Sequence, residues 1–231
     1  MTINLLDPIL TKLFHLLQTC GWISMDTDSM EAIGNRAGCA FFHGVSKGCF
    51  MHNSWDFVIK IPYYGFNASK DYCAEEEIAY LEIKEKYPLC SGMFAETEYL
   101  CTCGEIPVYA QRKIFQSVDE LLWNHHYDWF IKDLRKYSAD LSSSSKDFAR
   151  DYDKVIGSRI SSLFCAAIVR AYGYKAFKTL CKWIVDTDQN DLHASNIGFT
   201  EDLYPIIFDF SGWYDNDDSS GSSFDSELAS L

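Results

Sequence analysis

Apolar side chains recur along this chain with two different periods, and each period predicts a different kind of element. Near the start, leucine and isoleucine side chains repeat every three to four residues, as on one face of an α-helix. These side chains are Leu5, Leu6, Ile9, Leu10, Leu13, Leu16 and Leu17. Asp7 followed by Pro8 is typical of an N-cap and a first helical turn. We therefore expect a packing helix over residues 5 to 20.

Between residues 30 and 116 the apolar runs become shorter, which predicts strands around one helix. A strand, a glycine turn and a second strand are expected in MEAIGNRAGCAFFHGV, and a further strand in WDFVIKIPY. A helix is expected in DYCAEEEIAYLEIKEK, residues 71 to 86, because its spacing is helical and Pro88 follows. Two more strands are expected around residues 94 to 101 and 106 to 114.

From residue 117 onward the helical period returns. Ser117 and Glu120 form the S-x-x-E pattern of a capping box ahead of an apolar run. Gly173 separates two further expected helices, and a short strand pair is expected after them. Their ranges are residues 147 to 171 and 173 to 186 for the helices and 197 to 209 for the strand pair.

Strands that precede helices in this way predict an α+β protein of two lobes. We expect a packing helix within residues 1 to 29, a strand-rich lobe over 30 to 116 and a shortened helical lobe over 117 to 213. Residues 214 to 231 are acidic and rich in serine, which predicts a disordered tail.

Composition narrows the classes of function. The 231 residues are 48% apolar, which is enough for a sizeable core, and the formal net charge of −13 disfavours general nucleic-acid binding. The first residues lack the pattern of a secretory signal, and no apolar run is long enough to span a bilayer. The nine cysteines are scattered without C-x-x-C pairs, so we expect reduced thiols in a cytosol rather than a zinc site.

Five residues supply, in a consistent order, the parts that phosphoryl transfer from ATP requires. Lys60, near the end of the strand VIKI, is a cation for the phosphates, and Glu77 in the next helix is a carboxylate partner for it. Asn196 and Asp209 offer the amide and carboxylate oxygens that magnesium prefers. Asp191 is the candidate base that orients the attacking hydroxyl and accepts its proton.

Simpler interpretations compete with this one. Asp191 and Asn196 are also residues of turns and caps, and a strand-end lysine such as Lys60 can bury its stem while its ammonium reaches solvent. His193, in the same loop, is expected to be structural. The agreement in order between the lysine strand, the glutamate helix and the polar loop favours the chemical interpretation.

This order resembles that of the protein kinases. VIKI resembles their V-A-I-K strand, Asp191 and Asn196 match their D-x-x-x-x-N loop, and the DFS that begins at Asp209 resembles DFG. The D-L-H form of the loop is similar to small-molecule phosphotransferases and to the small early serine/threonine kinases of podoviral coliphages, and the short chain favours the phage kinases. The resemblance implies a two-lobed protein-kinase-like fold with a five-stranded N-lobe and a truncated helical C-lobe.

The phage kinases imply an enzyme of the host cytoplasm that uses ATP and Mg²⁺ and phosphorylates host bacterial proteins and itself. IGNRAGCAFF is similar to their degenerate phosphate loop, so the resemblance assigns Gly34, Arg36 and Gly38 to phosphate binding. The acidic charge and the lack of a long apolar run predict no direct contact with nucleic acid or membrane.

By position, the adenine-binding hinge falls at Lys113, Ile114 and Phe115. The chain departs from the kinase pattern at Gln189, which replaces the histidine of H-R-D, and at Ser211, which replaces the glycine of DFG. The residues after DFS are too few for an activation loop and a peptide-docking subdomain.

Two other functions stay open on these grounds. A kinase-like scaffold without efficient catalysis could be a binding module that inhibits a host enzyme through its acidic surface, which the net charge of −13 favours. The D-L-H loop also permits a small-molecule phosphotransferase, with residues 117 to 171 as its substrate-binding segment.

Overall fold

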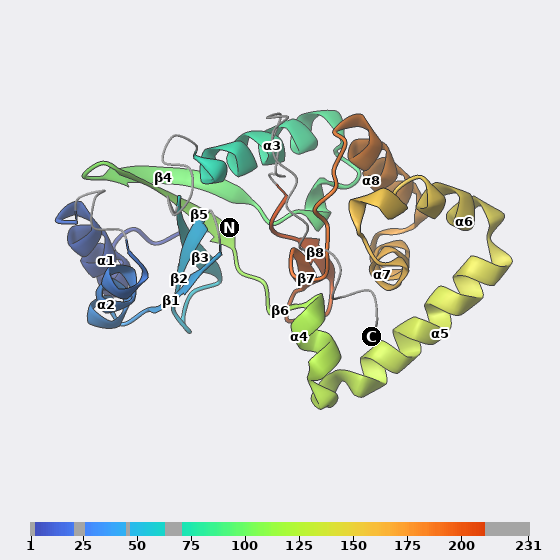
Figure 1. Cartoon of the computed structure of the whole chain (residues 1–231), viewed down its shortest axis with the longest axis horizontal. Helices are drawn as coiled ribbons and strands as arrows, with labels where there is room; N and C mark the ends of the chain where they lie inside the picture. The colour runs from blue at the N-terminus through green and yellow to red at the C-terminus, as the bar shows by residue number, and fades with distance from the viewer. Residues whose placement is uncertain (1–2, 21–25, 45–46, 63–70, 211–231) are drawn as a thin grey trace, which may run out of the picture.

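The computed structural model describes residues 3–20, 26–44, 47–62 and 71–210, which form an α+β fold with a five-stranded antiparallel sheet and several helices (Figure 1). The helices are α1 (Pro8–Gln18), α2 (Thr27–Ala37), α3 (Tyr72–Lys86), α4 (Val118–Trp123), α5 (Asp128–Ser144), α6 (Lys146–Asp153), α7 (Ser162–Tyr172) and α8 (Tyr174–Asp186). The strands are β1 (Ala40–His43), β2 (Lys47–Met51), β3 (Phe57–Pro62), β4 (Thr97–Cys103), β5 (Ile106–Arg112), β6 (Gln116–Ser117), β7 (Ile197–Phe199) and β8 (Pro205–Ile207). The expected acidic tail over residues 214 to 231, and Ser211 before it, lie outside the described residues.

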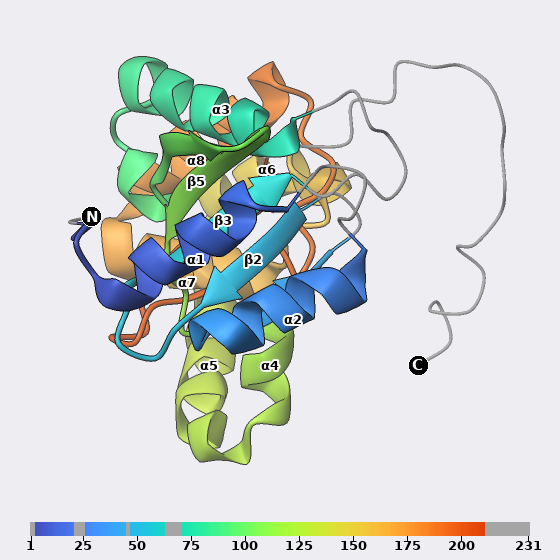
Figure 2. The ribbon, with the colours of Figure 1, turned by 90° about the vertical axis from the view of Figure 1, so that its left-hand side faces the viewer.

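The five-stranded sheet has the order β1-β2-β3-β5-β4, with each neighbouring pair antiparallel. Because successive side chains of a strand point to opposite faces, β3 divides its residues between two environments. Phe57, Ile59 and Ile61 join the core beneath α1 and α2, whereas Val58 and Lys60 face the other side. Figure 2 shows α1 and α2 in front of the sheet, away from most of the other helices.

Helix α1 forms where the sequence predicts it. The Asp7 side chain accepts hydrogen bonds from the backbone N–H groups of Ile9 and Leu10 at 2.9 and 3.0 Å, and Pro8 occupies the first turn. The buried leucines of α1 pack in the same core as the sheet. They are Leu10, Leu13, Leu16 and Leu17.

Helix α2 contradicts the strand, turn and strand expected for MEAIGNRAGCAFFHGV. The Asp26 side chain caps this helix by accepting from the N–H of Ser29 at 2.8 Å, and Gly38 ends it with a left-handed φ of 95°. Its buried residues recur at helical spacing and are Met30, Ile33, Gly34 and Ala37. The expected boundary at residue 30 therefore falls inside a helix, and only β1 remains of the two expected strands.

Helix α3 spans nearly the range that the sequence predicts, and its first turn is fixed to the sheet. One carboxylate oxygen of Asp71 accepts the backbone N–H groups of Cys73 and Ala74, both at 3.0 Å. The other oxygen accepts the hydroxyl of Tyr109 on β5 at 2.7 Å. This clamp sets which face of α3 turns toward β3.

The rest of the chain is mainly helical around a second sheet of order β6-β7-β8. The capping box of Ser117 and Glu120 is confirmed at the start of α4. The single helix expected over residues 147 to 171 is wrong, because the chain leaves helical geometry between α6 and α7, where Arg159 has a φ of 65°. Gly173 separates α7 from α8, as expected.

The buried apolar residues form two separate clusters, one on each side of the molecule. One cluster joins α1 and α2 to the sheet, and we call this part, the described residues of 3–62 and 95–115, the sheet half. The other joins helices α5 to α8 with β7 and β8, and we call residues 116–210 the helical half. The end of α3 packs in the helical cluster through Ile83, while its start is bound to β5. No helix in the described part of the chain is both long and apolar enough to cross a membrane.

Candidate active site

A cleft of about 540 Å³ lies between the sheet half and the helical half. One wall is made by β2, β3 and β5, and the other by α4, the loop before β7 and the segment after β8. A cavity of this size is in the range of small-molecule sites. The candidate site residues that line it are Lys60, Lys113, Ile114, Phe115, Asp191, Asn196 and Asp209.

Lys60 is buried on β3, and its ammonium group has two partners. Its Nζ donates to Oε2 of Glu76 at 2.5 Å and to Oε1 of Gln111 at 3.2 Å. Gln111 is itself fixed, because its Nε2 donates to Oγ1 of Thr97 and to the carbonyl oxygen of Phe208, both at 2.9 Å. Gln111 thereby links the lysine to the segment that follows β8.

The expected pairing of Lys60 with Glu77 is wrong, because Glu76 takes that place. One residue along an α-helix turns the side chain by about 100°. Glu77 therefore points toward β4, where its Oε1 accepts the backbone N–H of Tyr99 at 2.7 Å. Glu76 is 0% exposed, whereas Glu77 is half-buried, and neither lines the cleft directly. The contact of Glu77 fixes α3 to the edge strand of the sheet.

Lys47, at the start of β2, is a second buried cation that the sequence analysis did not identify. Its Nζ lies 3.3 Å from Oε1 of Glu76 and 2.5 Å from Oδ1 of Asp209. Opposite charges therefore alternate from Lys60 through Glu76 and Lys47 to Asp209. The Asp209 side chain is 41% exposed, so the end of this row is open to the cleft.

Burial and pairing act in opposite directions on the charges of this row. Burial disfavours the ammonium of Lys47, but the carboxylates of Asp209 and Glu76 outweigh burial and raise its pKa. Burial also disfavours the ammonium of Lys60, but the Glu76 carboxylate outweighs burial and raises the pKa of Lys60. Partial desolvation in the cleft favours the neutral form of Asp209, yet Lys47 and Lys60 lower its pKa. Both lysines and Asp209 are therefore ionised at neutral pH.

Asp191 and Asn196 face each other across the loop between α8 and β7. Nδ2 of Asn196 donates to the carbonyl oxygen of Asp191 at 2.8 Å and to its Oδ2 at 3.1 Å. The carbonyl oxygen of Asn196 accepts the N–H of Phe208 at 3.1 Å, which ties the loop to the residue before Asp209. Leu192 is 0% exposed, and its N–H donates to Ser158, so the loop is anchored in the helical half.

His193 lines the cleft beside Asp191. Its Nε2 lies 3.4 Å from Oδ1 of Asp191, and its Nδ1 accepts the N–H of Ser195 at 3.2 Å. The Ser195 hydroxyl donates to Asp119 of α4 at 2.8 Å. His193 therefore positions the Asp191 carboxylate, which agrees with a structural role.

Residues 113–115 connect the two halves and line the cleft. The N–H of Lys113 donates to Asp56 at 3.0 Å, and the N–H of Phe115 donates to Phe199 at 2.9 Å. Within the described residues, the backbone N–H of Ile114 has no hydrogen-bond acceptor. This segment can therefore offer a backbone donor to a planar heterocycle.

Gly34, Arg36 and Gly38 do not reach the cleft, and the phosphate loop expected there is wrong. They lie in α2 and at its C-cap, on the opposite face of the sheet. Gly34 has a packing reason instead, because a Cβ there would lie 3.0 Å from the carbonyl oxygen of Cys39.

The end of β1 and the residue that follows it border the cleft instead. The N–H of Gly44 donates to the carbonyl oxygen of Lys47 at 2.9 Å, and Phe42 and Gly44 both line the cleft. The period of β2 also explains the position of Lys47, because Lys47, Cys49 and Met51 share the face that lines the cleft. This alternation was a signal in the sequence for the second lysine.

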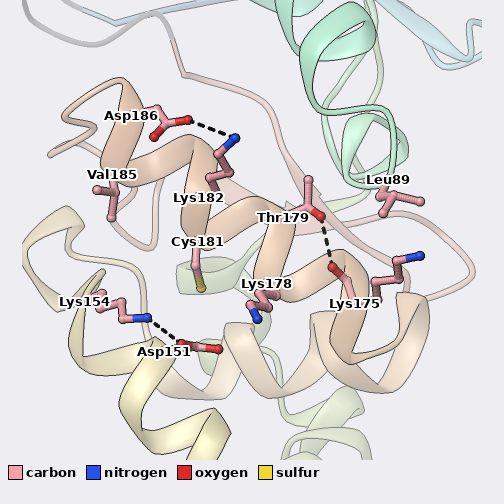
Figure 3. A pocket seen from close by; sticks show the side chains of 10 residues that line it. All are labelled: Leu89, Asp151, Lys154, Lys175, Lys178, Thr179, Cys181, Lys182, Val185 and Asp186. Atoms are coloured by element: carbon pink, nitrogen blue, oxygen red, sulfur yellow. Dashed lines mark hydrogen bonds and ion pairs between the residues drawn. The ribbon is translucent and has the colours of Figure 1, made fainter.

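A second cavity, of about 560 Å³, lies on the helical half beside α8 (Figure 3). Its lysines are Lys154, Lys175, Lys178 and Lys182. Its carboxylates are engaged within the cavity, since Asp151 pairs with Lys154 at 2.7 Å and Asp186 lies 3.8 Å from Lys182. None of the predicted site residues lines this cavity.

The groups in the cleft suit a nucleotide with magnesium. Asn196 uses its amide nitrogen toward Asp191, which leaves its amide oxygen available, and the Asp209 carboxylate offers further oxygens, one of which contacts Lys47. No group of three or more His, Cys, Asp or Glu side chains in the described ranges could hold a metal by itself. Magnesium would therefore share these ligands with phosphate oxygens and water, which is its usual manner of binding.

Comparisons of the chain with protein-family models, with curated proteins and with solved structures find no match.

Proposed function

We propose that this chain is a Mg-ATP-dependent protein serine/threonine kinase. The observation that carries the proposal is the meeting of a paired lysine, a carboxylate next to an amide, and a second carboxylate in one cleft. These groups come from β3, from the loop before β7 and from the segment after β8, which are far apart in the sequence. Phosphoryl transfer needs these parts together, because its catalysis consists mainly of positioning and charge stabilisation.

Each residue has a role that follows from its contacts. Lys60 binds the α- and β-phosphates, and Glu76 holds its ammonium in place at 2.5 Å. The N–H of Ile114, which has no acceptor among the described residues, donates a hydrogen bond to the adenine ring. Asn196 and Asp209 hold magnesium, which when bound neutralises charge on the phosphates.

Asp191 acts on the substrate hydroxyl. The hydroxyl oxygen forms a bond to the γ-phosphorus while the bond from that phosphorus to the β–γ bridging oxygen breaks, and ADP leaves with the bonding electrons. Asp191 accepts the hydroxyl proton. Asn196 and His193 hold the two carboxylate oxygens of Asp191 at 3.1 and 3.4 Å, so the group is oriented before the substrate binds.

The substrate class rests on the resemblance to the early phage kinases. It favours bacterial host proteins as substrates, and it favours the serines between residues 219 and 230 as sites of self-phosphorylation. The alternative is a catalytically weak binding module. It is favoured because residues 34–38 form no glycine loop at the cleft.

The experiment is transfer of labelled γ-phosphate from Mg-ATP by the purified full chain, alone and with a bacterial lysate. We expect label on lysate proteins or on the chain itself with the wild type, and a loss of about 100-fold or more with Asp191→Ala, as when a general base is removed. Asp209→Ala tests the metal ligand in the same way. Lys178→Met is the control, because this exposed lysine on α8 lies outside the cleft.

A folded wild-type protein that transfers no label would overturn the proposal. A host protein that co-purifies equally with the wild type and with Asp191→Ala would then support the binding module.

A further inference from the structure

Lys47 distinguishes this cleft from one with a single phosphate-binding lysine. Its side chain is 6% exposed, and burial of a charge at this depth is costly unless the charge is paired. It has two carboxylates within ion-pair distance, Glu76 at 3.3 Å and Asp209 at 2.5 Å. The shorter contact is the one to Asp209.

That contact uses the same group that the proposed function assigns to magnesium. Magnesium binds oxygen at about 2.0–2.1 Å and requires close to octahedral geometry. An ammonium nitrogen 2.5 Å from Oδ1 of Asp209 occupies space in which a metal bound to that oxygen would lie. Lys47 and a metal therefore compete for this oxygen of Asp209.

We propose that Lys47 is a displaceable counter-ion of Asp209: it neutralises this carboxylate when the cleft lacks a nucleotide, and it moves to the nucleotide phosphates when a metal binds Asp209. The inference rests on the proposed function and adds a regulatory step to the same site. It predicts that the empty protein binds metal weakly, and that metal and nucleotide bind cooperatively.

The surroundings of Lys47 allow this movement. Glu76 remains a partner after Asp209 is released, because it contacts Lys47 through Oε1 and Lys60 through Oε2. Lys60 cannot take the same role, because Glu76 and Gln111 hold its ammonium and, among the described residues, it donates no hydrogen bond to Asp209. Lys47 is also the first residue of β2, and it lines the cleft.

Charge balance supports the exchange. The two lysines and the two carboxylates of the row sum to zero, so the row itself offers no excess negative charge to a divalent ion while Lys47 is bound to Asp209. The phosphates of a nucleotide bring new negative charge, which gives Lys47 another partner and leaves Asp209 to the metal.

The test measures binding of Mn²⁺ alone to the full chain, by the electron paramagnetic resonance signal of the free ion. Lys47→Met removes the competing ammonium, so we expect Mn²⁺ to bind about tenfold tighter or more than to the wild type, the scale of a lost charge-assisted hydrogen bond. The same variant should bind ATP more weakly in the presence of metal. Opposite changes for the two ligands are the signature of a displaceable counter-ion.

Three further variants give the test its controls. Lys178→Met removes one positive charge outside the cleft, and we expect its Mn²⁺ affinity to match the wild type. In Asp209→Asn the gain from Lys47→Met should vanish, because the contested carboxylate is gone. Lys47→Arg keeps the positive charge, so we expect it to bind Mn²⁺ as weakly as the wild type. It replaces Lys47→Met in the comparison if Lys47→Met does not fold, and tighter Mn²⁺ binding by Lys47→Arg would then overturn the inference.

Unchanged or weaker Mn²⁺ binding by folded Lys47→Met overturns the inference about Lys47. If the wild type nevertheless binds Mn-ATP and transfers phosphate, the proposed function stands without it. Failure of the wild type to bind ATP with metal overturns both, so the two failures are distinct.

Discussion

Lys60 and Glu76 are buried together on β3 and α3, and their mutual contact is the residue-level basis of the site. Breaking a buried ion pair by removing one partner leaves an uncompensated charge, which typically costs about 3–5 kcal/mol of stability. Glu76 holds two ammonium groups, at 2.5 and 3.3 Å, so its loss affects both lysines.

Two neighbouring substitutions separate Glu76 from Glu77. We expect Glu76→Gln to lower the free energy of unfolding by about 3–5 kcal/mol, because Lys47 and Lys60 lose their shared carboxylate. Glu77→Gln keeps an oxygen that can accept the N–H of Tyr99, so we expect a change within about 0.5 kcal/mol. Urea unfolding measures both, and equal effects would contradict the assigned partnership.

Asp151 gives a prediction that depends on pH. Burial opposes its ionisation, but hydrogen bonds from Lys154 and Tyr174 outweigh burial and lower its pKa from 3.8 to about 2. Because the pKa of Asp151 is lower in the folded protein than in the unfolded chain, its charge stabilises the fold at any pH above about 4. This contribution is lost as the pH falls from about 4 through 2. Thermal unfolding over this range should therefore show a steeper decline for the wild type than for Asp151→Asn. Parallel curves would count against a charged Asp151 in the folded protein.

The sequence located the site residues only in part, for reasons visible at single positions. That Lys60, Asp191, Asn196 and Asp209 would come together was predictable from their pattern in one strand and in the loop and strand pair, and all four line the cleft. Glu77 was chosen in place of Glu76, because the run of three glutamates does not reveal which one faces inward. The buried positions Cys73, Glu76 and Ile83 repeat at helical spacing and could have identified it.

At the scale of elements, the short sheet β6-β7-β8 carries the loop with Asp191 and Asn196 next to the segment with Asp209. The strands β6 and β7 approach closely at Gly198, where a Cβ would lie 2.4 Å from the carbonyl oxygen of Gln116. Any side chain there must move the backbone of β6, which begins directly after the hinge candidates.

Gly198→Ala tests this close approach. We expect it to destabilise the protein by about 1–3 kcal/mol, the usual cost of forcing extra atoms into a packed site. Gly157→Ala is the matched control, because a Cβ at Gly157 meets nothing within 4 Å. Chemical unfolding of both variants provides the comparison. Equal stability of the two would show that β6 and β7 can separate at little cost.

Most elements were predictable from the period of apolar residues, and the exceptions have local causes. Helix α3, the strands β3 to β5 and the capping box of α4 follow strong patterns. Helix α2 was missed, because Gly34 and Gly38 resemble turn residues although one is packed inside the helix and the other caps it. The break between α6 and α7 depends on the left-handed conformation of Arg159, a non-glycine residue for which the sequence carries no signal.

At the scale of the whole molecule, the cleft exists because two apolar cores pack separately and meet along residues 113–115 and α3 (Figure 1). The sheet half contributes both lysines, and the helical half contributes Asp191, Asn196 and Asp209. Neither half holds the complete set of groups, so a ligand that needs both cations and carboxylates must bind between them.

The most direct test of this account is equilibrium binding of Mg-ATP to the full chain by isothermal titration calorimetry. We predict saturable binding of one nucleotide by the wild type, weakened about tenfold or more in both Lys60→Met and Asp209→Ala, one from each half, and unchanged in Lys178→Met. Thermal unfolding should first establish that each variant is folded. Absence of saturable binding by the folded wild type, or equal affinity in all four proteins, would contradict a nucleotide site in the cleft.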